Sequence, residues 1–282
     1  MKISKLKKNT ILKNGTVIDP LNNTEKKADV HIENGLIKSI GKVSTQKSAE
    51  TIDCKGLIIT HGFCDLHAHF REPGREDKED LNAGSESALA GGFTRVCIMP
   101  NSEPPVDSPE VIRYLIERSD ECPIYIHPIG TITKGQKGNE LAEISEMVAS
   151  GAVAISDDGV PLMNGNVMRF AVEYCKMINI AVINHAEDVF LRSGAVMNES
   201  SVSTKLGLQG SPHITESIMV SRDLMINEHV NSRIHVPHVS SKESVEIIRR
   251  YKKSSNMVSA EVTPHHLTLI DEEMATYDPR YK

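Results

Sequence analysis

Short apolar runs recur along the chain from residue 57 onward, and each of them ends in polar residues. The seven runs are Leu57–Phe63, Phe93–Met99, Pro123–Ile126, Val153–Ile155, Ile180–Ile183, Ile234–Val236 and Met257–Val262. Runs of this length that alternate with helical patterns predict the buried strands of a parallel sheet. The polar residues after the runs recur about every 30 residues, the repeat of a (β/α)8 TIM-type barrel.

The strand count predicts an incomplete barrel. Seven strands fit the pattern, and the 20 residues that follow Val262 are too few for an eighth strand and its helix. We therefore expect strand eight to be missing, in a chain that is a fragment of a longer enzyme. One interval between the polar positions is 53 residues long, which predicts a long loop around Arg192–Ile214. Helix starts are predicted at Ser108-Pro109-Glu110, and as a capping box at Ser240-Ser241-Lys242-Glu243.

The N-terminal residues carry a different pattern, in which alternating segments flank Asn-Gly pairs. Thr10–Lys13 and Thr16–Asp19 flank Asn14-Gly15, and Asp29–Glu33 and Leu36–Ile40 flank Asn34-Gly35. Asn-Gly supplies the positive φ angles of a two-residue type I′ turn, so both segments are predicted to be hairpins. We expect two domains: a small β unit over 1–56 and the barrel over 57–282.

Composition excludes several classes of protein. The chain has 282 residues and a net charge of −6, which argues against a nucleic-acid-binding surface. The basic N-terminal cluster is interpreted as a solvated end; it consists of Lys2, Lys5, Lys7 and Lys8. No apolar run of membrane-spanning length and no secretory signal pattern is present. The five cysteines form no CxxC pair, which is typical of reduced thiols and predicts a cytoplasmic location.

The strongest chemical signal is Asp65-Leu66-His67-Ala68-His69 at the end of the first run. Side chains alternate along a strand, so His67 and His69 face the same side. Two imidazoles at the C-terminal end of a barrel strand favour a divalent metal ion. A pair of structural histidines is the simpler alternative.

Three further positions make the metal interpretation stronger. His185 and His238 also follow apolar runs, and Asp157-Asp158 ends the fourth run. Four histidines and one carboxylate on one rim predict a site for two metal ions, in which the carboxylate bridges the ions. The residues alone leave open which of the two aspartates is the bridge.

Arg71 lies on the same strand face as the histidine pair. A guanidinium beside cations is explained if an anionic substrate lies between them and Arg71 binds its carboxylate. Asn101, after the second run, is predicted to donate a hydrogen bond to the same group. The alternatives are a rim salt bridge from Arg71 to Glu72 or Glu76, and a plain turn residue at 101.

The other histidines and one glycine-rich loop carry less weight. His127 and His235 are predicted to line the barrel, where they can hydrogen-bond to metal ligands. Of the adjacent pair His265-His266, at most one faces inward on a strand. Gly130–Gly138 is similar to a phosphate loop but lacks the Gly-Lys-Ser/Thr ending, so it is discounted.

These motifs together resemble a known family. The stretch from Asp65 to Asn101, DLHAHFREPGREDKEDLNAGSESALAGGFTRVCIMPN, closely resembles the bacterial class I dihydroorotases of the amidohydrolase superfamily. Four further segments resemble the same family: Ser156–Gly159, His185–Asp188, His235–Ser240 and Glu261–His266. The resemblance implies a metal-dependent amidohydrolase barrel with a small β-sandwich. It implies a reversible cyclisation of N-carbamoyl-L-aspartate to L-dihydroorotate in pyrimidine synthesis, with a zinc-bound hydroxide attacking the ring in the hydrolytic direction.

The resemblance also implies roles for individual residues. By position, the ligands of one or two zinc ions are His67, His69, Asp158, His185 and His238, and the residues that bind the substrate carboxylate are Arg71 and Asn101. The family's catalytic aspartate lies on strand eight, beyond Lys282, so no catalytic residue is assigned here. The expected partners are the small-molecule substrate, a second copy in a homodimer and aspartate transcarbamoylase, without nucleic acid or membrane.

Two other functions are weighed against this one. Dihydropyrimidinases, hydantoinases and allantoinases use a carboxylated lysine on strand four, whereas this chain reads Ala154-Ile155-Ser156-Asp157-Asp158 there. Non-catalytic dihydroorotase-like subunits that scaffold aspartate transcarbamoylase lose metal ligands, whereas all five ligand positions are present here. The sequence therefore favours a zinc-dependent dihydroorotase.

Overall fold

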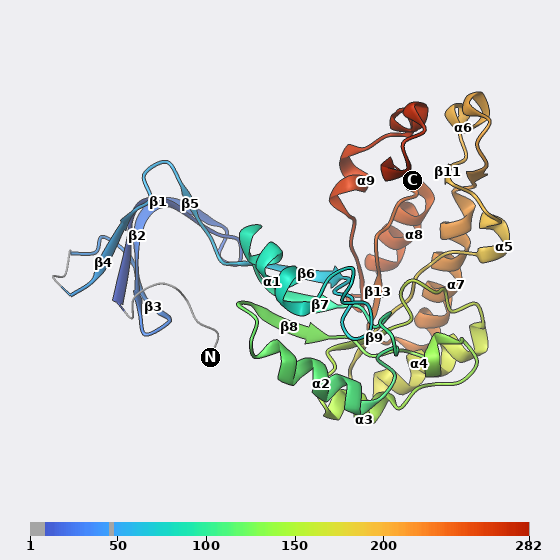
Figure 1. Ribbon diagram of the computed structural model, residues 1–282, viewed down its shortest axis with the longest axis horizontal. Coiled ribbons are helices and arrows are strands. Elements are labelled where there is room, and N and C mark those ends of the chain that lie inside the picture. The colour runs from blue at the N-terminus through green and yellow to red at the C-terminus, as the bar shows by residue number, and fades with distance from the viewer. Residues whose placement is uncertain (1–8, 45–47, 282) are drawn as a thin grey trace.

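The computed structural model describes residues 9–44 and 48–281, and Figure 1 shows them as two parts. A small β-sheet, whose strands lie between Asn9 and Ile59, stands beside a larger part in which parallel strands alternate with helices. The basic cluster at Lys2, Lys5, Lys7 and Lys8 lies outside the described residues. Among the residues that are described, no helix has both the length and the apolar character needed to cross a bilayer.

The N-terminal sheet has five strands. They are β1 (Asn9–Asp19), β2 (Thr24–Glu33), β3 (Leu36–Gly41), β4 (Glu50–Asp53) and β5 (Ile58–Ile59). The order is β3-β2-β1-β4, and β5 pairs with the second half of β1. The sheet therefore extends past residue 56, and the segment from Leu57 is not the start of the first barrel strand.

The two Asn-Gly pairs behave differently. Asn34-Gly35 joins β2 to β3 with positive φ at both residues, so the predicted hairpin is confirmed. The predicted turn at Asn14-Gly15 is wrong, because β1 continues through it and pairs with β2 on either side of a register shift. Only Asn14 has a positive φ there, and its side chain donates to Asp53. The pair forms a bulge because a long partner strand, β2, holds both halves of β1 in one ladder.

Seven parallel strands make up the larger sheet. They are β6 (Phe63–Ala68), β7 (Phe93–Ile98), β8 (Tyr125–Pro128), β9 (Ala154–Ser156), β10 (Ala181–Ile183), β13 (Ile234–Val236) and β14 (Val258–Ala260). They form two ladders, β6-β7-β8 and β9-β10-β13-β14, and a bridge from Gly130 to Ile155 joins the two. Six of the seven apolar runs overlap strands of this sheet, although Pro123–Ile126 shares only two residues with β8. The first run is misplaced, because the first strand of this sheet begins at Phe63.

Helices connect these strands and lie on the outside of the sheet (Figure 1). The helices that directly join strands of the barrel are α1 (Leu81–Ala90), α2 (Pro109–Ser119), α3 (Ile144–Ala149), α4 (Gly165–Met177), α7 (Ile214–Val230) and α8 (Lys242–Lys252), of which α3 is a short one. The other short ones are α5 (Val189–Arg192), α6 (Ser201–Leu206) and α9 (Pro264–Thr268). The predicted long loop at 192–214 contains α6 and a short ladder of β11 (Met197–Asn198) and β12 (Gly210–Ser211).

The predicted helix starts are correct in position but not in every contact. Helix α2 starts at Pro109 with Ser108 before it. Helix α8 is capped by Ser241, whose hydroxyl accepts from the Ser244 N–H, so Glu243 does not close a capping box. Glu216 of α7 accepts instead from the backbone amides of Ser240 and Ser241. Glu216, on a neighbouring helix, thus accepts the hydrogen bonds from the backbone at the start of α8 that a capping box would have assigned to Glu243.

The parallel sheet separates two apolar layers. The large core lies between the strands and the outer helices and includes Ile112, Leu115 and Val182. A small second cluster consists of Met99, Ile129, Ala154 and Ile183. Met99 and Ile129 directly follow β7 and β8, and Ala154 and Ile183 lie in β9 and β10. This arrangement leaves polar side chains at the C-terminal ends of the strands free to meet one another.

Candidate metal centre

Asp158 is the centre of a cluster of histidines. It follows β9, and only 3% of its side chain is exposed. His67 Nε2 and His69 Nε2 lie 3.4 and 3.3 Å from Oδ2. His185 Nδ1 and His238 Nε2 lie 3.4 and 3.2 Å from Oδ1. Each carboxylate oxygen therefore faces its own pair of imidazole nitrogens.

The spacing within each pair fits a metal ion. The two Nε2 atoms of His67 and His69 are 3.2 Å apart, and His185 Nδ1 is 3.1 Å from His238 Nε2. Each pair forms, with its carboxylate oxygen, a triangle whose edges are all between 3.1 and 3.4 Å. Donors about 2.1 Å from a tetrahedral ion are about 3.4 Å apart. The five side chains therefore have the donor chemistry and the spacing for two ions that share one carboxylate.

The electrostatics of the cluster point the same way. Burial opposes ionisation of Asp158, but hydrogen bonds from His185, His238 and His67 hold its pKa far below the usual range. Burial likewise disfavours the charged forms of His67 and His185, yet the adjacent carboxylates raise both pKa values to about 9. The cluster therefore favours positive charge, which protonated imidazoles or a divalent cation can supply.

Strand ends bring these residues together. His67 lies in β6 and His69 one residue beyond it, while Asp158, His185 and His238 each stand two residues after β9, β10 and β13. Parallel neighbours place their carboxyl ends at one edge, so side chains from residues 67 to 238 meet there. Of this set, His67, Asp158 and His238 have ligand atoms that all lie within 4.8 Å of one another.

Comparison with known proteins shows which family the chain belongs to. A family model described as "Dihydro-orotase-like" matches residues 56–244, which include every residue of the cluster. The chain belongs to this family. A dihydroorotase of Solibacter usitatus is 43% identical over 273 residues, and one of Trichlorobacter lovleyi is 44% identical over 276 residues. These alignments cover 96% and 97% of this chain but 64% and 65% of the relatives, so the chain spans a little under two thirds of their length.

Solved structures show the fold of this dihydro-orotase-like chain. The L-hydantoinase (dihydropyrimidinase) of Arthrobacter aurescens superposes with a TM-score of 0.83 at 18% identity, covering 97% of this chain and 62% of that one. A D-hydantoinase gives a TM-score of 0.77 at 21% identity, over 95% of this chain and 60% of that one. The larger part thus has the α/β TIM-type barrel fold of the amidohydrolases.

The structure separates the roles of the two adjacent aspartates. Asp157 points away from the histidines: its carboxylate accepts from the backbone amides of Ile132 and Thr133 and from the Thr133 hydroxyl. Burial raises the pKa of Asp157, and these three donors stabilise it in place. Asp158 alone of the pair faces the cluster.

Arg71 and Asn101 lie beside the first histidine pair. The alternative that Arg71 forms a rim salt bridge is wrong: Glu72 pairs with Arg118, Glu76 accepts from the Gly74 amide, and no carboxylate of the described residues pairs with Arg71. Arg71 is close enough to act electrostatically on His69, whose pKa is lowered, chiefly by burial. Asn101 Oδ1 is 2.8 Å from His69 Nδ1, so Asn101 holds His69 and is more than a turn residue.

Two carboxylates that contact the histidines were given no role by the sequence analysis. Glu261 Oε1 is 2.8 Å from His67 Nδ1, and Glu187 Oε2 is 3.4 Å from His185 Nε2. Glu187 could have been found from its place two residues after His185. Glu261 was missed because the last apolar run was read through to Val262, whereas β14 ends at Ala260 and Glu261 is the first polar residue after it.

The four other histidines with a predicted place at the barrel divide into two pairs. His127 lies in β8, where its Nε2 is 3.3 Å from an Arg95 guanidinium nitrogen, and His235 lies in β13 and is 9% exposed. His235 Nε2 is 3.3 Å from Glu261, so His235 lines the interior as predicted. His265 and His266 are not on a strand, because both lie in α9. Burial, His265 and His238 lower the pKa of His266, which places it near the cluster.

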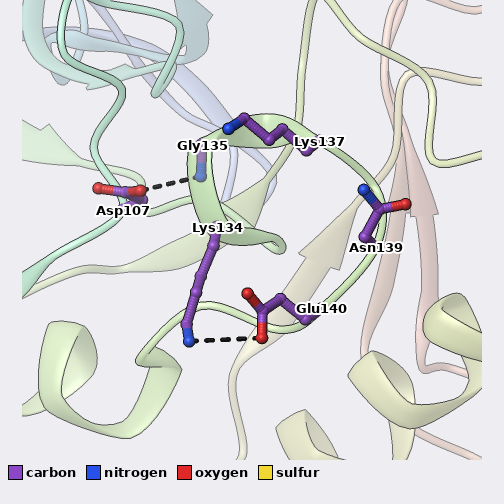
Figure 2. Close-up of a pocket in the computed structure, with 6 residues that line it drawn as sticks. All are labelled: Asp107, Lys134, Gly135, Lys137, Asn139 and Glu140. Carbon is purple, nitrogen blue, oxygen red and sulfur yellow. Dashed lines mark hydrogen bonds and ion pairs between the residues drawn. The ribbon is translucent and has the colours of Figure 1, made fainter.

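The glycine-rich loop lies at a separate surface pocket of about 260 Å³ (Figure 2). The pocket is lined by Asp107, Lys134, Gly135, Lys137, Asn139 and Glu140. The Gly135 amide donates to Asp107, and Lys134 pairs with Glu140 at 3.5 Å (Figure 2). With two acids among its lining residues and one amide already bound to a carboxylate, this loop is not arranged as a phosphate site.

Proposed function

We propose that this chain carries the metal centre and part of the substrate site of a dihydroorotase, which interconverts L-dihydroorotate and N-carbamoyl-L-aspartate. The observation that carries the proposal is the Asp158 carboxylate shared between two histidine pairs, in a chain 43–44% identical to proteins named dihydroorotase. We propose zinc as the metal, because four imidazoles and one carboxylate are ligands that zinc prefers. Its ligands would be His67, His69, Asp158, His185 and His238.

Zinc, when bound, polarises a carbonyl oxygen and lowers the pKa of water toward neutrality. The chain's own residues orient the substrate. The Arg71 guanidinium, free of carboxylate partners among the described residues, is available to bind the substrate carboxylate with two parallel hydrogen bonds. Asn101 gives its oxygen to His69, which leaves its amide nitrogen to donate to the same carboxylate. Hydrolysis breaks the ring C–N bond: the carbonyl carbon gains the water oxygen and the leaving nitrogen gains a proton.

We propose that both parts of the fold are larger in the complete protein than the described residues show. The five-stranded sheet would be part of a β-sandwich unit, with the boundary to the barrel after Ile59 rather than at 56. The seven parallel strands would be part of an eight-stranded barrel, since β6 and β14 share no ladder in the described part of the chain. We also propose that the protein forms a homodimer and associates with aspartate transcarbamoylase.

A related cyclic amidase is the second candidate, because hydantoinases share the fold with a TM-score of 0.83. The absence of a lysine from Ala154–Ser156 and from Asp157-Asp158 argues for dihydroorotate as the substrate. A panel of dihydroorotate, hydantoin and dihydrouracil separates the two. Faster turnover of hydantoin than of dihydroorotate by protein containing this chain would contradict the proposal.

The site assignment is tested by substitution in the same protein. We expect His67→Ala or His185→Ala to abolish activity and to lower the zinc content, because each removes one donor of a pair. Arg71→Ala should keep its zinc and raise the KM for dihydroorotate at least tenfold, the effect of losing a charge-assisted bidentate contact. Metal analysis and steady-state kinetics are the measurements. A fully active His67→Ala variant would exclude the assignment.

A further inference from the structure

Four polar side chains on the inner face of the sheet contact one another in series: Ser259, His235, Glu261 and His67. We call this series the column. Ser259 Oγ is 2.9 Å from His235 Nδ1, and His235 Nε2 is 3.3 Å from Glu261 Oε2. The other oxygen of Glu261 is 2.8 Å from His67 Nδ1. The column joins residues of β14, β13 and β6, and it approaches His67 from the side opposite Asp158.

The contact with Glu261 determines which nitrogen of His67 is available to a metal. A carboxylate accepts hydrogen bonds and does not donate them, so His67 Nδ1 must carry the proton. The lone pair is then on Nε2, the atom that faces Asp158. A ring without this partner has two tautomers and a freer side-chain torsion, and only one of these arrangements presents a donor to the ion.

Glu261 has little structural reason to be ionised at this place. Only 20% of its side chain is exposed, and its ion-pair partners among the described residues are His67 and His235 rather than any lysine or arginine. Charged groups withdrawn from water are paired, hydrogen-bonded or coordinated to metals. Here both oxygens are held by imidazoles, one of which is directed at the metal centre.

The position of Glu261 in the sheet adds to this argument. Strands β6 and β14 belong to different ladders, and no backbone pairing joins them in the part of the chain that the structure describes. The Glu261–His67 hydrogen bond links their carboxyl ends across a separation of 194 residues in sequence. The ring of His67 is therefore oriented by a side chain from the far edge of the sheet.

We propose that Glu261 is a positioning residue, which fixes the tautomer and the orientation of His67, and that His235 in turn holds Glu261. This inference rests on the proposed metal centre. It differs from the roles of Asn101 and Glu187, which contact His69 and His185: Glu261 combines a full charge with a distance of 2.8 Å, whereas Asn101 is neutral and Glu187 is 3.4 Å away.

The test is zinc binding to the metal-free full chain, measured by competition with a chromophoric chelator, without any substrate. We expect Glu261→Ala to lower zinc affinity 10- to 100-fold, the usual effect of losing a carboxylate behind a ligating histidine. Glu261→Gln, whose amide oxygen still accepts from His67 Nδ1, should restore most of the affinity. Ser259→Ala, at the far end of the column, is the matched control and should bind zinc within about threefold of the unsubstituted chain.

Two further measurements separate positioning from a general structural role. Cobalt substituted for zinc should show an altered visible spectrum in Glu261→Ala and a normal one in Ser259→Ala. Thermal unfolding of the metal-free chain shows whether Glu261→Ala is folded. If it is not, Glu261→Asp, whose shorter side chain withdraws the carboxylate from His67 Nδ1, provides the comparison, and a zinc affinity of this variant equal to that of the unsubstituted chain would overturn the inference.

The outcomes also separate this inference from the proposed function. If the unsubstituted chain does not bind zinc, the metal centre itself is wrong. If it binds zinc and a folded Glu261→Ala binds it equally well, the metal centre stands and the positioning role of Glu261 is excluded. A loss of affinity in Ser259→Ala as large as that in Glu261→Ala would also contradict the inference, because the effect would then not depend on contact with His67.

Discussion

At the scale of single residues, buried carboxylates have different roles in this protein, and the groups around each carboxylate decide its role. Asp157 and Asp158 are neighbours in sequence, and both are buried. Backbone amides and a hydroxyl surround Asp157, so it fastens the loop at 132–133. Four imidazoles surround Asp158, which makes it a centre of negative charge. Glu72 is a third case: a buried carboxylate that accepts from Leu81 N, the Tyr114 hydroxyl and Arg118.

Glu72 gives a prediction about acid stability. Burial disfavours its charge, but the three donors outweigh burial and lower its pKa below the ordinary 4.5. A lowered pKa stabilises the fold above about pH 4.5, and this stabilisation is lost as the pH falls through the folded-state pKa. Glu72→Gln should therefore cost about 2 kcal/mol of unfolding free energy at pH 7, and the difference should shrink below pH 4.5.

Urea unfolding between pH 3 and 7 measures this effect. Glu86→Gln is the control, since Glu86 is an exposed residue of α1; its substitution should change stability by less than about 0.5 kcal/mol at every pH. A difference between Glu72→Gln and the unsubstituted protein that stays constant with pH would show that the charge of Glu72 is not what stabilises the fold.

At the scale of elements, the loops after β6 and β7 are packed as one unit. The Glu103 amide donates to the Pro73 carbonyl, and Gly74 has a φ of +90° with its α-carbon directly against the Glu103 carbonyl. A Cβ at Gly74 would lie 1.8 Å from that oxygen. These loops carry Arg71 and Asn101, so the contact sets the distance between the two proposed substrate-binding groups.

Gly74→Ala tests whether this packing serves the substrate site. The added methyl group must push the two loops apart, because it meets backbone rather than a flexible side chain. We expect the KM for dihydroorotate to rise at least tenfold while the zinc content is kept, since His69, the nearest proposed ligand in the sequence, is five residues before Gly74 and directly follows β6. The control is Gly56→Ala, which has a similar φ of +80° but no atom within 4 Å of the new methyl group. Equal KM values in the two variants would refute the coupling.

At the scale of the whole molecule, the proposed metal centre would join the two halves of the parallel sheet. His67 and His69 lie in or directly after β6 of the ladder β6-β7-β8, whereas Asp158, His185 and His238 follow strands of the ladder β9-β10-β13-β14. In Figure 1 the N-terminal sheet stands apart from this region. Ligands that bind only the folded state stabilise it by mass action, so bound metal should stabilise the barrel more than the N-terminal sheet.

Metal removal tests this division. A chelator should lower the midpoint of thermal unfolding, with a loss of about 3 kcal/mol if the site was saturated a hundredfold above its Kd. Hydrogen exchange should become faster in β6 and β9 and stay unchanged in β1 and β2, which contain no proposed ligand. Exchange that accelerates equally in both parts, or in neither, would contradict the role of the centre in joining the two ladders.

Much of this organisation was predictable from the sequence. Apolar runs indicate strands because the buried positions of a strand need apolar side chains. Six of the seven runs overlap a strand of the parallel sheet. His67, His69, His185 and His238 could be singled out because polar residues directly after buried strands share one edge. The choice of Asp158 over Asp157 came from the resemblance to a known family, because the residues alone did not distinguish the two. Asn34-Gly35 predicted its hairpin because the turn needs only its own two residues.

Other features were decided only by the tertiary structure. Asn14-Gly15 has the same residues as Asn34-Gly35, yet β2 and Ile59 around it make it a bulge. Glu216 replaces the expected capping partner of α8, and Glu261 meets His67 from 194 residues away. Local patterns record the interactions of a residue with its chain neighbours, so they specify which elements form. Contacts between distant residues depend on strand register and packing, and these are fixed only when all the elements come together.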